Sequence, residues 1–485
     1  MDKVKLLSAL VSLIPMTMMA ANQDDYYTKE QIPLPKGVTL EVGCLSLFGD
    51  DQLVVGTRRG EIWVLSNIHA EDVSDVKWQQ VFTGAHEPLG IFEKDGWFHF
   101  MDRDAYARIG DRDGDGTYEA YEVISNQWGI TGDYHEYNFG SRPDAEGNVY
   151  VAHCLTGSFQ AGSQWRGWVQ QIAPDGTTTP FASGVRSPGG IGFNGEGDLF
   201  YTDNQGIWNG TSCLKHAPKG KFTGCPKGNI FYRNAPAHMG ARPKEPVDGS
   251  RIVTEAKRIP EYVPPAVQIP HGKVGQSPTA IYTPDEPAKL GLPEGQLLIG
   301  EHTHSGVQRV YLEKVNGVYQ GVVWKLLEKM KTGTLAIHVA ENGTMFTGGS
   351  VRGWPSNGQF PLAIERTKWT GVAPLEMEKV NATPNGFKIT FTEAVDPASV
   401  AAENFCKLSA WTYQYRAAYG SPEVDAVTPV VTKSTLSQDG TELTLELDQL
   451  TQGHVHHIQL NGIKTKAGKD LWHKDAYYTL NQIPN

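Results

Sequence analysis

The sequence has few cysteines and lacks the short motifs of several large enzyme classes. Five cysteines occur among 485 residues, an odd number, so at least one thiol is free or pairs outside the chain. Cys213 and Cys225 share one irregular segment, and an oxidising compartment would allow them to pair. The absence of Cys-x-x-Cys-His excludes covalently attached c-type haem. The absence of Gly-x-Ser-x-Gly, of His-Glu-x-x-His and of a dinucleotide fingerprint between a strand and a helix argues against serine hydrolases, zincins and NAD enzymes.

Positive charge and long apolar runs are also scarce. The 43 Lys and Arg are outnumbered by 54 Asp and Glu, and the formal net charge of -11 argues against nucleic acid as a partner. The one long apolar run, Leu6–Met19, follows two lysines and precedes Ala20 and Ala21. This pattern predicts a signal peptide over residues 1–21, and therefore a periplasmic or secreted mature chain with no transmembrane segment.

Glycine and proline are abundant, with 53 and 29 residues, which suits short strands joined by turns. One sequence pattern recurs: an acidic or amide residue begins a turn, and a short strand follows. The six turns begin at Asp51, Asp95, Asp144, Glu196, Glu294 and Asn342. Most of these turns lie about 45 to 50 residues from a neighbour, a spacing that fits one four-stranded propeller blade per period. The sequence therefore predicts an all-β fold with a six-bladed β-propeller over residues 22–372.

The repeat is interrupted between Gly197 and Gly295. Residues 213–263 within this gap are rich in Gly, Pro, Lys and Asn, and a long irregular stretch inside a compact domain is usually functional. We interpret this stretch as an insertion. Val247–Val253 would also suit a strand of a seventh blade, so seven blades stay an alternative.

The repeat ends around Trp369, and a different pattern follows. Phe387–Glu393, Leu443–Leu447 and His457–Leu460 are short alternating strands. Over about 110 residues they predict a small Ig-like β-sandwich at 373–485. Its aromatic side chains could bind sugar, although we expect them mainly to pack in the core: Trp411, Tyr413, Tyr415 and Tyr419.

The loop Asp111–Glu122 (DRDGDGTYEAYE) has the spacing of a calcium-binding loop. Oxygen-bearing side chains stand at positions 1, 3, 5, 9 and 12 with glycine at position 6. The predicted ligands are the side chains of five residues and one backbone carbonyl, that of Thr117: Asp111, Asp113, Asp115, Thr117, Glu119 and Glu122. A hydrated acidic turn is the alternative, and we expect a bound ion to be structural.

Propellers carry their chemistry in the loops at the mouth of the central channel. The loop before Asn148–Ala152 holds three groups that can move protons, Tyr134, His135 and Glu136, and another loop holds His86 and Glu87. A rigid Ser-Pro-Gly-Gly turn fixes Arg186, and a fixed guanidinium suits bidentate capture of a carboxylate. Further candidates in channel loops are Asn204, Trp208, His271, Lys273, Gln276, His302, Arg352 and Trp354.

Several of these phrases resemble the blade motifs of soluble quinoprotein (PQQ-dependent) sugar dehydrogenases. They are Leu53–Ile62 (LVVGTRRGEI), His135 before its repeat, Arg186–Gly190 (RSPGG) and Gln276–Thr279 (QSPT). Over nearly its whole length the chain is still more similar to a group of predicted secreted dehydrogenase-like propellers, some fused to cytochrome c. That group shares the phrases YHEYNFG, RSPGGIG, YTDNQGxWNG and AYYTLNxIP. The segment Phe391–Val400 resembles a bacterial Ig-like domain.

The resemblance implies a six-bladed propeller that binds PQQ and calcium at the channel mouth and oxidises a carbohydrate, with an external electron acceptor such as a cytochrome. It makes His135 the general base that takes the hydroxyl proton. The expected cofactor contacts are Arg186, Lys273, Arg352, Asn204 and Gln276. The expected substrate contacts are Trp208, Trp354, His302 and His271.

Two other functions stay open. One is a cofactor-free lyase or hydrolase that acts on polysaccharide and uses His135 with Glu136, His86 or Tyr134 as acid and base. The other is a carbohydrate-binding propeller without catalysis, in which tryptophans stack on sugar rings: Trp165, Trp168, Trp208 and Trp354. The clustering of His, Glu, Tyr and Arg in channel loops favours an enzyme.

Overall fold

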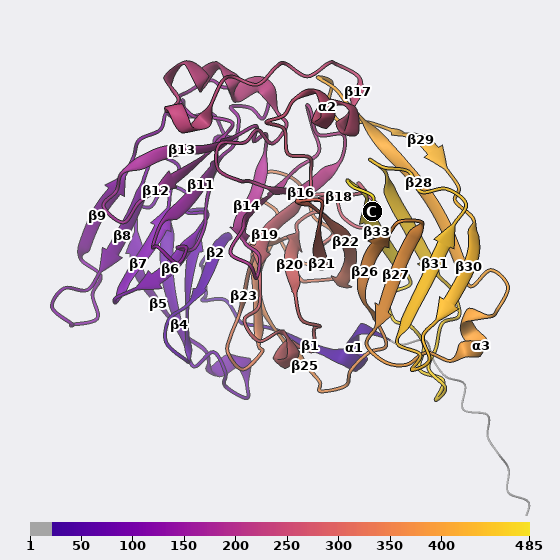
Figure 1. Ribbon diagram of the computed structural model, residues 1–485. Helices are drawn as coiled ribbons and strands as arrows, with labels where there is room; N and C mark the ends of the chain where they lie inside the picture. The colour runs from indigo at the N-terminus through magenta and orange to yellow at the C-terminus, as the bar shows by residue number, and fades with distance from the viewer. Residues whose placement is uncertain (1–21) are drawn as a thin grey trace, which may run out of the picture.

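The computed structural model describes residues 22–485, so the expected signal peptide lies outside the described residues. Four-stranded antiparallel sheets stand around one axis, and a second β-rich unit packs against one side of this ring (Figure 1). Within residues 22–485, no helix has the length and apolar character needed to cross a membrane.

Three ring sheets come from the first part of the chain, each built from consecutive strands that run outward from the axis. The first contains β2 (Val42–Leu47), β3 (Gln52–Thr57), β4 (Glu61–Ser66) and β5 (Lys77–Thr83). The second contains β6 (Ile91–Lys94), β7 (Trp97–Met101), β8 (Tyr106–Gly110) and β9 (Ala120–Ser125). The third contains β10 (Asn138–Gly140), β11 (Val149–His153), β12 (Trp168–Ile172) and β13 (Thr178–Ser183).

The later part of the chain continues the ring in the same way. The next sheet contains β14 (Pro188–Phe193), β15 (Leu199–Asp203), β16 (Ser212–His216) and β18 (Val267–Ile269). It is followed by β19 (Pro278–Tyr282), β20 (Gln296–Glu301), β21 (Gly306–Val315) and β22 (Val318–Leu327). The last sheet contains β23 (Thr334–Val339), β24 (Met345–Ser350), β25 (Leu362–Trp369) and, outermost, β1 (Tyr27–Gln31).

The N-terminal strand closes the ring. β1 pairs antiparallel with β25 along its whole length, from Tyr27 opposite Trp369 to Gln31 opposite Glu365. The innermost strands of the sheets surround a narrow axial cavity of about 90 Å³. Glycines permit the innermost strands to approach one another closely, since a Cβ added at Gly90 would lie 2.5 Å from the carbonyl oxygen of Gly140 on the next sheet.

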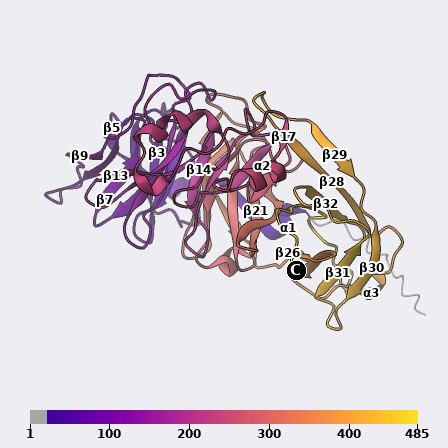
Figure 2. The ribbon, with the colours of Figure 1, turned by 45° about the horizontal axis from the view of Figure 1, so that its top comes forward.

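Between β16 and β18 the chain leaves the ring. This insertion contains η2 (Pro226–Asn234), η3 (Ala237–Met239), β17 (Ser250–Arg251) and α2 (Ile252–Arg258). β17 pairs with β28 of the second unit, Ser250 opposite Tyr415, so the segment around it adds no strand to the ring (Figure 2). Within residues 22–485 the cysteines are all free thiols, and Cys213 and Cys225 are buried without forming a disulfide.

The second unit packs two sheets face to face. One contains β26 (Met377–Thr383), β27 (Gly386–Phe391), β31 (Glu442–Leu447) and β30 (Val431–Leu436). The other contains β29 (Glu423–Val427), β28 (Cys406–Tyr415), β32 (Val455–Leu460) and β33 (Asp475–Thr479). Short helices lie in connecting segments: α1 (Gln23–Tyr26), η1 (Val73–Asp75), η4 (Pro287–Leu290) and α3 (Pro397–Val400).

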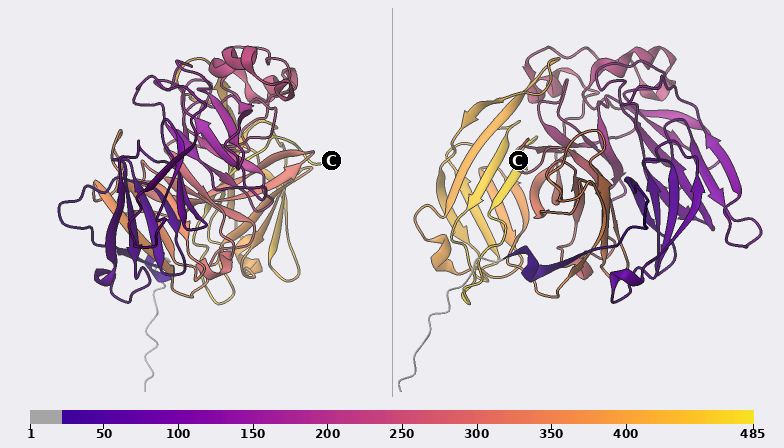
Figure 3. Two further views of the ribbon diagram at one scale, coloured as in Figure 1. Left: turned by 90° about the vertical axis from the view of Figure 1, so that its left-hand side faces the viewer. Right: turned by 180° about the vertical axis from the view of Figure 1, so that it is seen from behind.

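The second unit is joined to the ring by backbone hydrogen bonds. β33 pairs with the outermost strand β22, Gly321 opposite Thr479 and Val323 opposite Tyr477, so one sheet runs continuously through both parts. The C-terminal part of the chain, in yellow, lies against one side of the ring (Figure 3). Val322 and Trp324 of β22 are buried in the same apolar core as Phe387 of the second unit. The two parts therefore share a sheet and a core.

Candidate functional site

The loops that carry most of the predicted site residues meet at one end of the ring. Strands alternate in direction within each sheet, so the loops entering the first strand and leaving the second lie together at this end. His135 and Arg186 lie in loops that enter β10 and β14, and Asn204 follows β15. We call this end the loop face.

Buried carboxylates hold these loops in place. Three of them stand at the end of the second strand of their sheets: Asp102, Asp203 and Glu301. Asp203 accepts hydrogen bonds from the backbone amides of Arg186 at 3.2 Å and Ser187 at 2.7 Å, and Lys215 neutralises it at 3.0 Å. Asp102 and Glu301 accept hydrogen bonds from the amides of their own entering loops in the same way. This role is not predicted from the sequence, although each acid directly ends or follows a repeated strand.

A polar pocket of about 430 Å³ opens on the loop face. Six predicted site residues line it together: His135, Arg186, Asn204, Gln276, His271 and Trp354. Among the described residues that line this pocket, none is Asp or Glu. The pocket therefore favours a neutral or anionic ligand over a metal cation.

His135 has an imidazole that is free to take a proton. Neither of its ring nitrogens has a hydrogen-bond partner within residues 22–485, while its backbone amide donates to Asp133 at 2.8 Å. Partial burial lowers the pKa of His135; Arg186 and Arg103 lower it further, and Asp133 partly offsets them. The ring is therefore neutral at neutral pH, the state in which it can act as a base.

Arg186 is rigidly held beside this imidazole. Its side chain is 3% exposed, and it donates to the carbonyl oxygens of Ser158 at 3.2 Å and Gln205 at 2.7 Å. It lies flat on Gly206, where an added Cβ would come 2.1 Å from the guanidinium carbon. Its Nη2 has no hydrogen-bond partner among the described residues. Arg186 can thus offer a fixed, charged donor to a ligand.

A second hollow on the loop face, of about 730 Å³, is lined by arginines. Buried Glu87 bridges Arg58 at 2.6 Å and Arg103 at 2.5 Å. Arg352 also lines this hollow and pairs with Glu41 at 2.9 Å. Glu87 is thus the counter-ion of two arginines, and Arg352 lies apart from Arg186.

Several predicted catalytic residues are placed elsewhere. Glu136 is buried and accepts hydrogen bonds from the amide of Thr131 at 2.6 Å and the hydroxyl of Thr156 at 2.5 Å, so it stabilises the loop behind His135. The exposed side chain of His86 lies 3.3 Å from Asp104. Tyr134 lines the arginine hollow.

Some predicted cofactor and substrate contacts also lie outside the pocket. Lys273 does not reach it, because its ammonium pairs with Glu423 at 2.8 Å and sits over the ring of Trp411. Trp208 is buried in a core cluster and cannot stack on a ligand. His302 is fully buried under Trp354, with Nε2 at 2.8 Å from the carbonyl oxygen of Ser350, and burial lowers its pKa to about 4.

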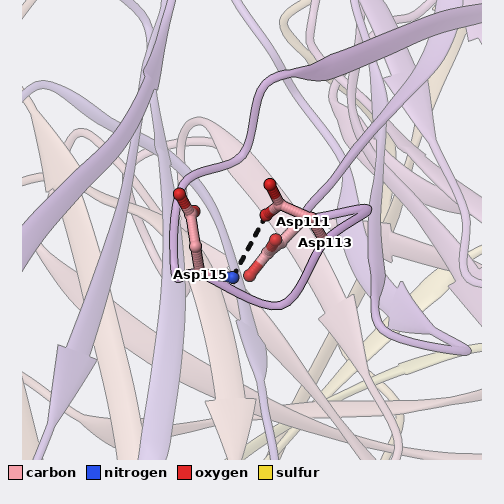
Figure 4. Close-up of side chains that lie close together, drawn as sticks. All are labelled: Asp111, Asp113 and Asp115. Atoms are coloured by element: carbon pink, nitrogen blue, oxygen red, sulfur yellow. Dashed lines mark hydrogen bonds between the residues drawn. The ribbon is translucent and has the colours of Figure 1, made fainter.

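The predicted calcium loop lies at the other end of the ring. It joins β8 to β9, whereas the loop with His135 follows the far end of β9. Carboxylate oxygens of Asp111, Asp113 and Asp115 lie within 4.8 Å of one another (Figure 4). An ion held there would be remote from the His135 pocket.

The remaining predicted ligands of this loop are engaged differently. Glu122 accepts hydrogen bonds from Arg108 and Arg112, each at 2.6 Å, and so does not close the loop as a bidentate ligand. Glu119 accepts a hydrogen bond from the amide of Arg112 at 3.3 Å. The amide of Thr117 donates to Asp115 at 2.7 Å, which leaves the predicted ligand role of its backbone carbonyl as a prediction.

Comparison with known proteins gives a likeness of fold. No family model and no curated protein matches the chain. A solved structure described as an oxidoreductase (glucose dehydrogenase) from Thermus thermophilus aligns with 70% of this chain and 99% of its own, at 15% identity and a TM-score of 0.50. The PQQ-bound aldose sugar dehydrogenase of Streptomyces coelicolor aligns with 71% of this chain and 98% of its own, at 12% identity and a TM-score of 0.49.

The holo form of the PQQ domain of pyranose dehydrogenase from Coprinopsis cinerea is a further match. It aligns with 72% of this chain and 96% of its own, at 12% identity and a TM-score of 0.47. The expected resemblance to soluble PQQ-dependent sugar dehydrogenase-like propellers is confirmed, and at these identities it is a resemblance of fold.

The buried charge of Glu87 generates a stability prediction. Glu87→Gln leaves Arg58 and Arg103 without their shared counter-ion, and breaking a buried pair in this way costs about 3–5 kcal/mol of unfolding free energy. Denaturant unfolding of the purified protein measures this loss. The matched control is Glu446→Gln, which removes an exposed ion pair with Lys433 and is expected to cost less than about 1 kcal/mol. Equal stabilities of the two variants would contradict the role given to Glu87.

Proposed function

We propose that this protein is an oxidoreductase that oxidises a carbohydrate hydroxyl in the His135–Arg186 pocket with PQQ as cofactor. One observation carries the proposal: a neutral imidazole without ring hydrogen bonds faces the same pocket as a buried, fixed arginine. Oxidation of a hydroxyl next to an anionic cofactor requires a general base that takes the hydroxyl proton and a positive charge that stabilises the cofactor.

The residues of the pocket fit a planar, anionic quinone. Nη2 of Arg186 has no hydrogen-bond partner among the described residues, and the side-chain amide of Gln276, which lines the same pocket, is also unpaired there. Both are donors, and PQQ presents carboxylate and carbonyl acceptors. The indole ring of Trp354 also lines the pocket. Because the lining residues described above include no carboxylate, the pocket does not fit a calcium ion.

In the proposed reaction PQQ, when bound, supplies the two-electron acceptor. His135 takes the proton of the substrate hydroxyl, and its lowered pKa keeps the ring ready for this at neutral pH. Arg186 binds negative charge, and Asp203 with Lys215 fixes the backbone from which Arg186 projects. Asn204 and Gln276 orient ligands through their side-chain amides.

We propose the remaining features from the sequence patterns and from the arrangement of the sheets. Each ring sheet counts as one blade, which gives six blades over residues 22–372, followed by an Ig-like sandwich at 373–485. Residues 1–21 act as a signal peptide, so the chain works in the periplasm or outside the cell and passes electrons to an external acceptor such as a cytochrome. Calcium binds the loop that holds Asp111, Asp113 and Asp115 as a structural ion.

A glycoside hydrolase is less well supported by this pocket. Hydrolysis of a glycosidic bond normally uses two carboxyl groups on opposite sides of the bond. Asp133 lies behind His135, where it accepts hydrogen bonds from the amides of His135 and Gly157. The groups that line the pocket are two imidazoles, a guanidinium, amides, hydroxyls and aromatic rings.

The test reconstitutes the full chain with PQQ and calcium and measures its turnover as the reduction of a dye, over a panel of aldoses and oligosaccharides. The wild type is expected to reduce the dye, and His135→Ala is expected to lower kcat by about 10²- to 10⁴-fold because the general base is lost. His86→Ala, which removes an exposed imidazole outside the pocket, is the matched control and keeps wild-type activity.

Three outcomes would contradict the proposal. A protein that binds no PQQ and reduces no dye is not this dehydrogenase. Cleavage of sugar without an electron acceptor would establish the lyase or hydrolase instead. Full activity of His135→Ala would remove His135 as the base.

The pKa of His135 also predicts a pH profile. Protonated imidazole cannot take a proton, so kcat/KM falls in acid with a midpoint below 6.5, the ordinary pKa of histidine. Asp133 raises the pKa of His135, so Asp133→Asn is expected to move this midpoint to still lower pH. Initial rates between pH 4 and 8 measure both midpoints. A wild-type midpoint above 6.5, or a shift to higher pH in the variant, would argue against His135 as the titrating base.

A further inference from the structure

The second unit contributes a wall to the His135–Arg186 pocket. The loop between β28 and β29, residues 416–422, lies on the ring loop 204–210. The amide of Gly420 donates to the carbonyl oxygen of Gly206 at 3.0 Å, and the amide of Trp208 donates to that of Arg416 at 2.7 Å. These contacts fix the loop at the mouth of the pocket.

Tyr419, at the tip of this loop, lines the pocket together with Phe159 of the ring. Their ring centres lie 6.2 Å apart, and the guanidinium carbon of Arg186 lies 5.1 Å from the centre of the Tyr419 ring. Tyr419 is 57% exposed and Phe159 is 50% exposed, although both are large apolar side chains. The other aromatic residues of the neighbouring strand are buried: Trp411, Tyr413 and Tyr415.

Exposed aromatic rings next to unpaired amides are the groups that bind sugars. An aromatic face packs against the C–H face of a pyranose ring, and nearby polar groups bind its hydroxyls. The side chains of Gln276 and His271 line the same pocket and have no hydrogen-bond partners within residues 22–485. Packing against a ligand is therefore what the exposed face of Tyr419 can provide.

We propose that Tyr419 and Phe159 form a stacking subsite for a second sugar ring, so that the substrate is an oligosaccharide or polysaccharide chain end. The ring to be oxidised enters beside His135, and the next ring packs on Tyr419. The inference rests on the proposed function for the identity of the reaction. It makes a residue of the C-terminal unit a determinant of substrate length.

The first experiment measures binding without chemistry. The full chain without added PQQ is titrated calorimetrically with maltotetraose, cellotetraose and glucose. One of the two tetrasaccharides is expected to bind the wild type. Tyr419→Ala is expected to lower the affinity for that tetrasaccharide about tenfold and to leave the affinity for glucose unchanged. Tyr419→Phe keeps wild-type affinity because the ring face is retained.

The matched control is Tyr121→Ala, which removes a 46%-exposed tyrosine on β9 away from the pocket and is expected to leave all affinities unchanged. Circular dichroism and thermal unfolding check that both alanine variants fold. Equal tetrasaccharide affinity of wild type and Tyr419→Ala, or no tetrasaccharide binding by the wild type, would overturn the subsite.

A second experiment separates this inference from the proposed reaction. In dye reduction with PQQ, Tyr419→Ala is expected to raise KM for the tetrasaccharide about tenfold, with kcat unchanged. Binding that depends on Tyr419 without dye reduction would leave the subsite standing and remove the dehydrogenase. Dye reduction with the same KM in the wild type and in Tyr419→Ala would leave the dehydrogenase standing and remove the subsite.

Discussion

The candidate site depends on the buried carboxylate of Asp203. A charge placed in a protein interior is costly unless it is paired and hydrogen-bonded, and Asp203 has Lys215 as its counter-ion and two loop amides as donors. Those amides belong to Arg186 and Ser187. Because the buried Asp203–Lys215 pair needs these two amide donors, it fixes the position of the loop. Arg186 therefore enters the pocket from a rigid backbone.

The same principle organises the whole loop face. Glu301 holds the loop with Gln276, and Glu87 holds Arg58 and Arg103 in a neighbouring hollow. Charges used in this way are unavailable for catalysis. The His135 ring and Nη2 of Arg186 have no hydrogen-bond partners among the described residues, and both residues line the pocket. The second unit shares a sheet with the ring through β22 and β33 and completes this pocket with Tyr419.

Sequence patterns predicted the fold class well, because a turn followed by a short apolar strand is a local signal that repeats. They also predicted that His135 and Arg186 lie in one pocket, because both residues stand before repeated strands. They failed where long-range contacts decide. Glu136 turns inward to the hydroxyl of Thr156, Lys273 is drawn away by Glu423 of the second unit, and Trp208 is covered by Tyr415. For Tyr419 the strand pattern favours core packing over sugar binding, since nothing local marks a residue that reaches another part of the chain.

The most direct measurement is the equilibrium affinity for PQQ, followed by its absorbance, in wild type and two arginine variants. Arg186→Met is expected to weaken PQQ binding at least tenfold, because a charge-assisted donor inside the pocket is lost. Arg352→Met, which changes the neighbouring hollow where Arg352 pairs with Glu41, is predicted to bind PQQ like the wild type. Unchanged affinity in Arg186→Met, with loss in Arg352→Met, would place the cofactor in the other hollow and contradict the account.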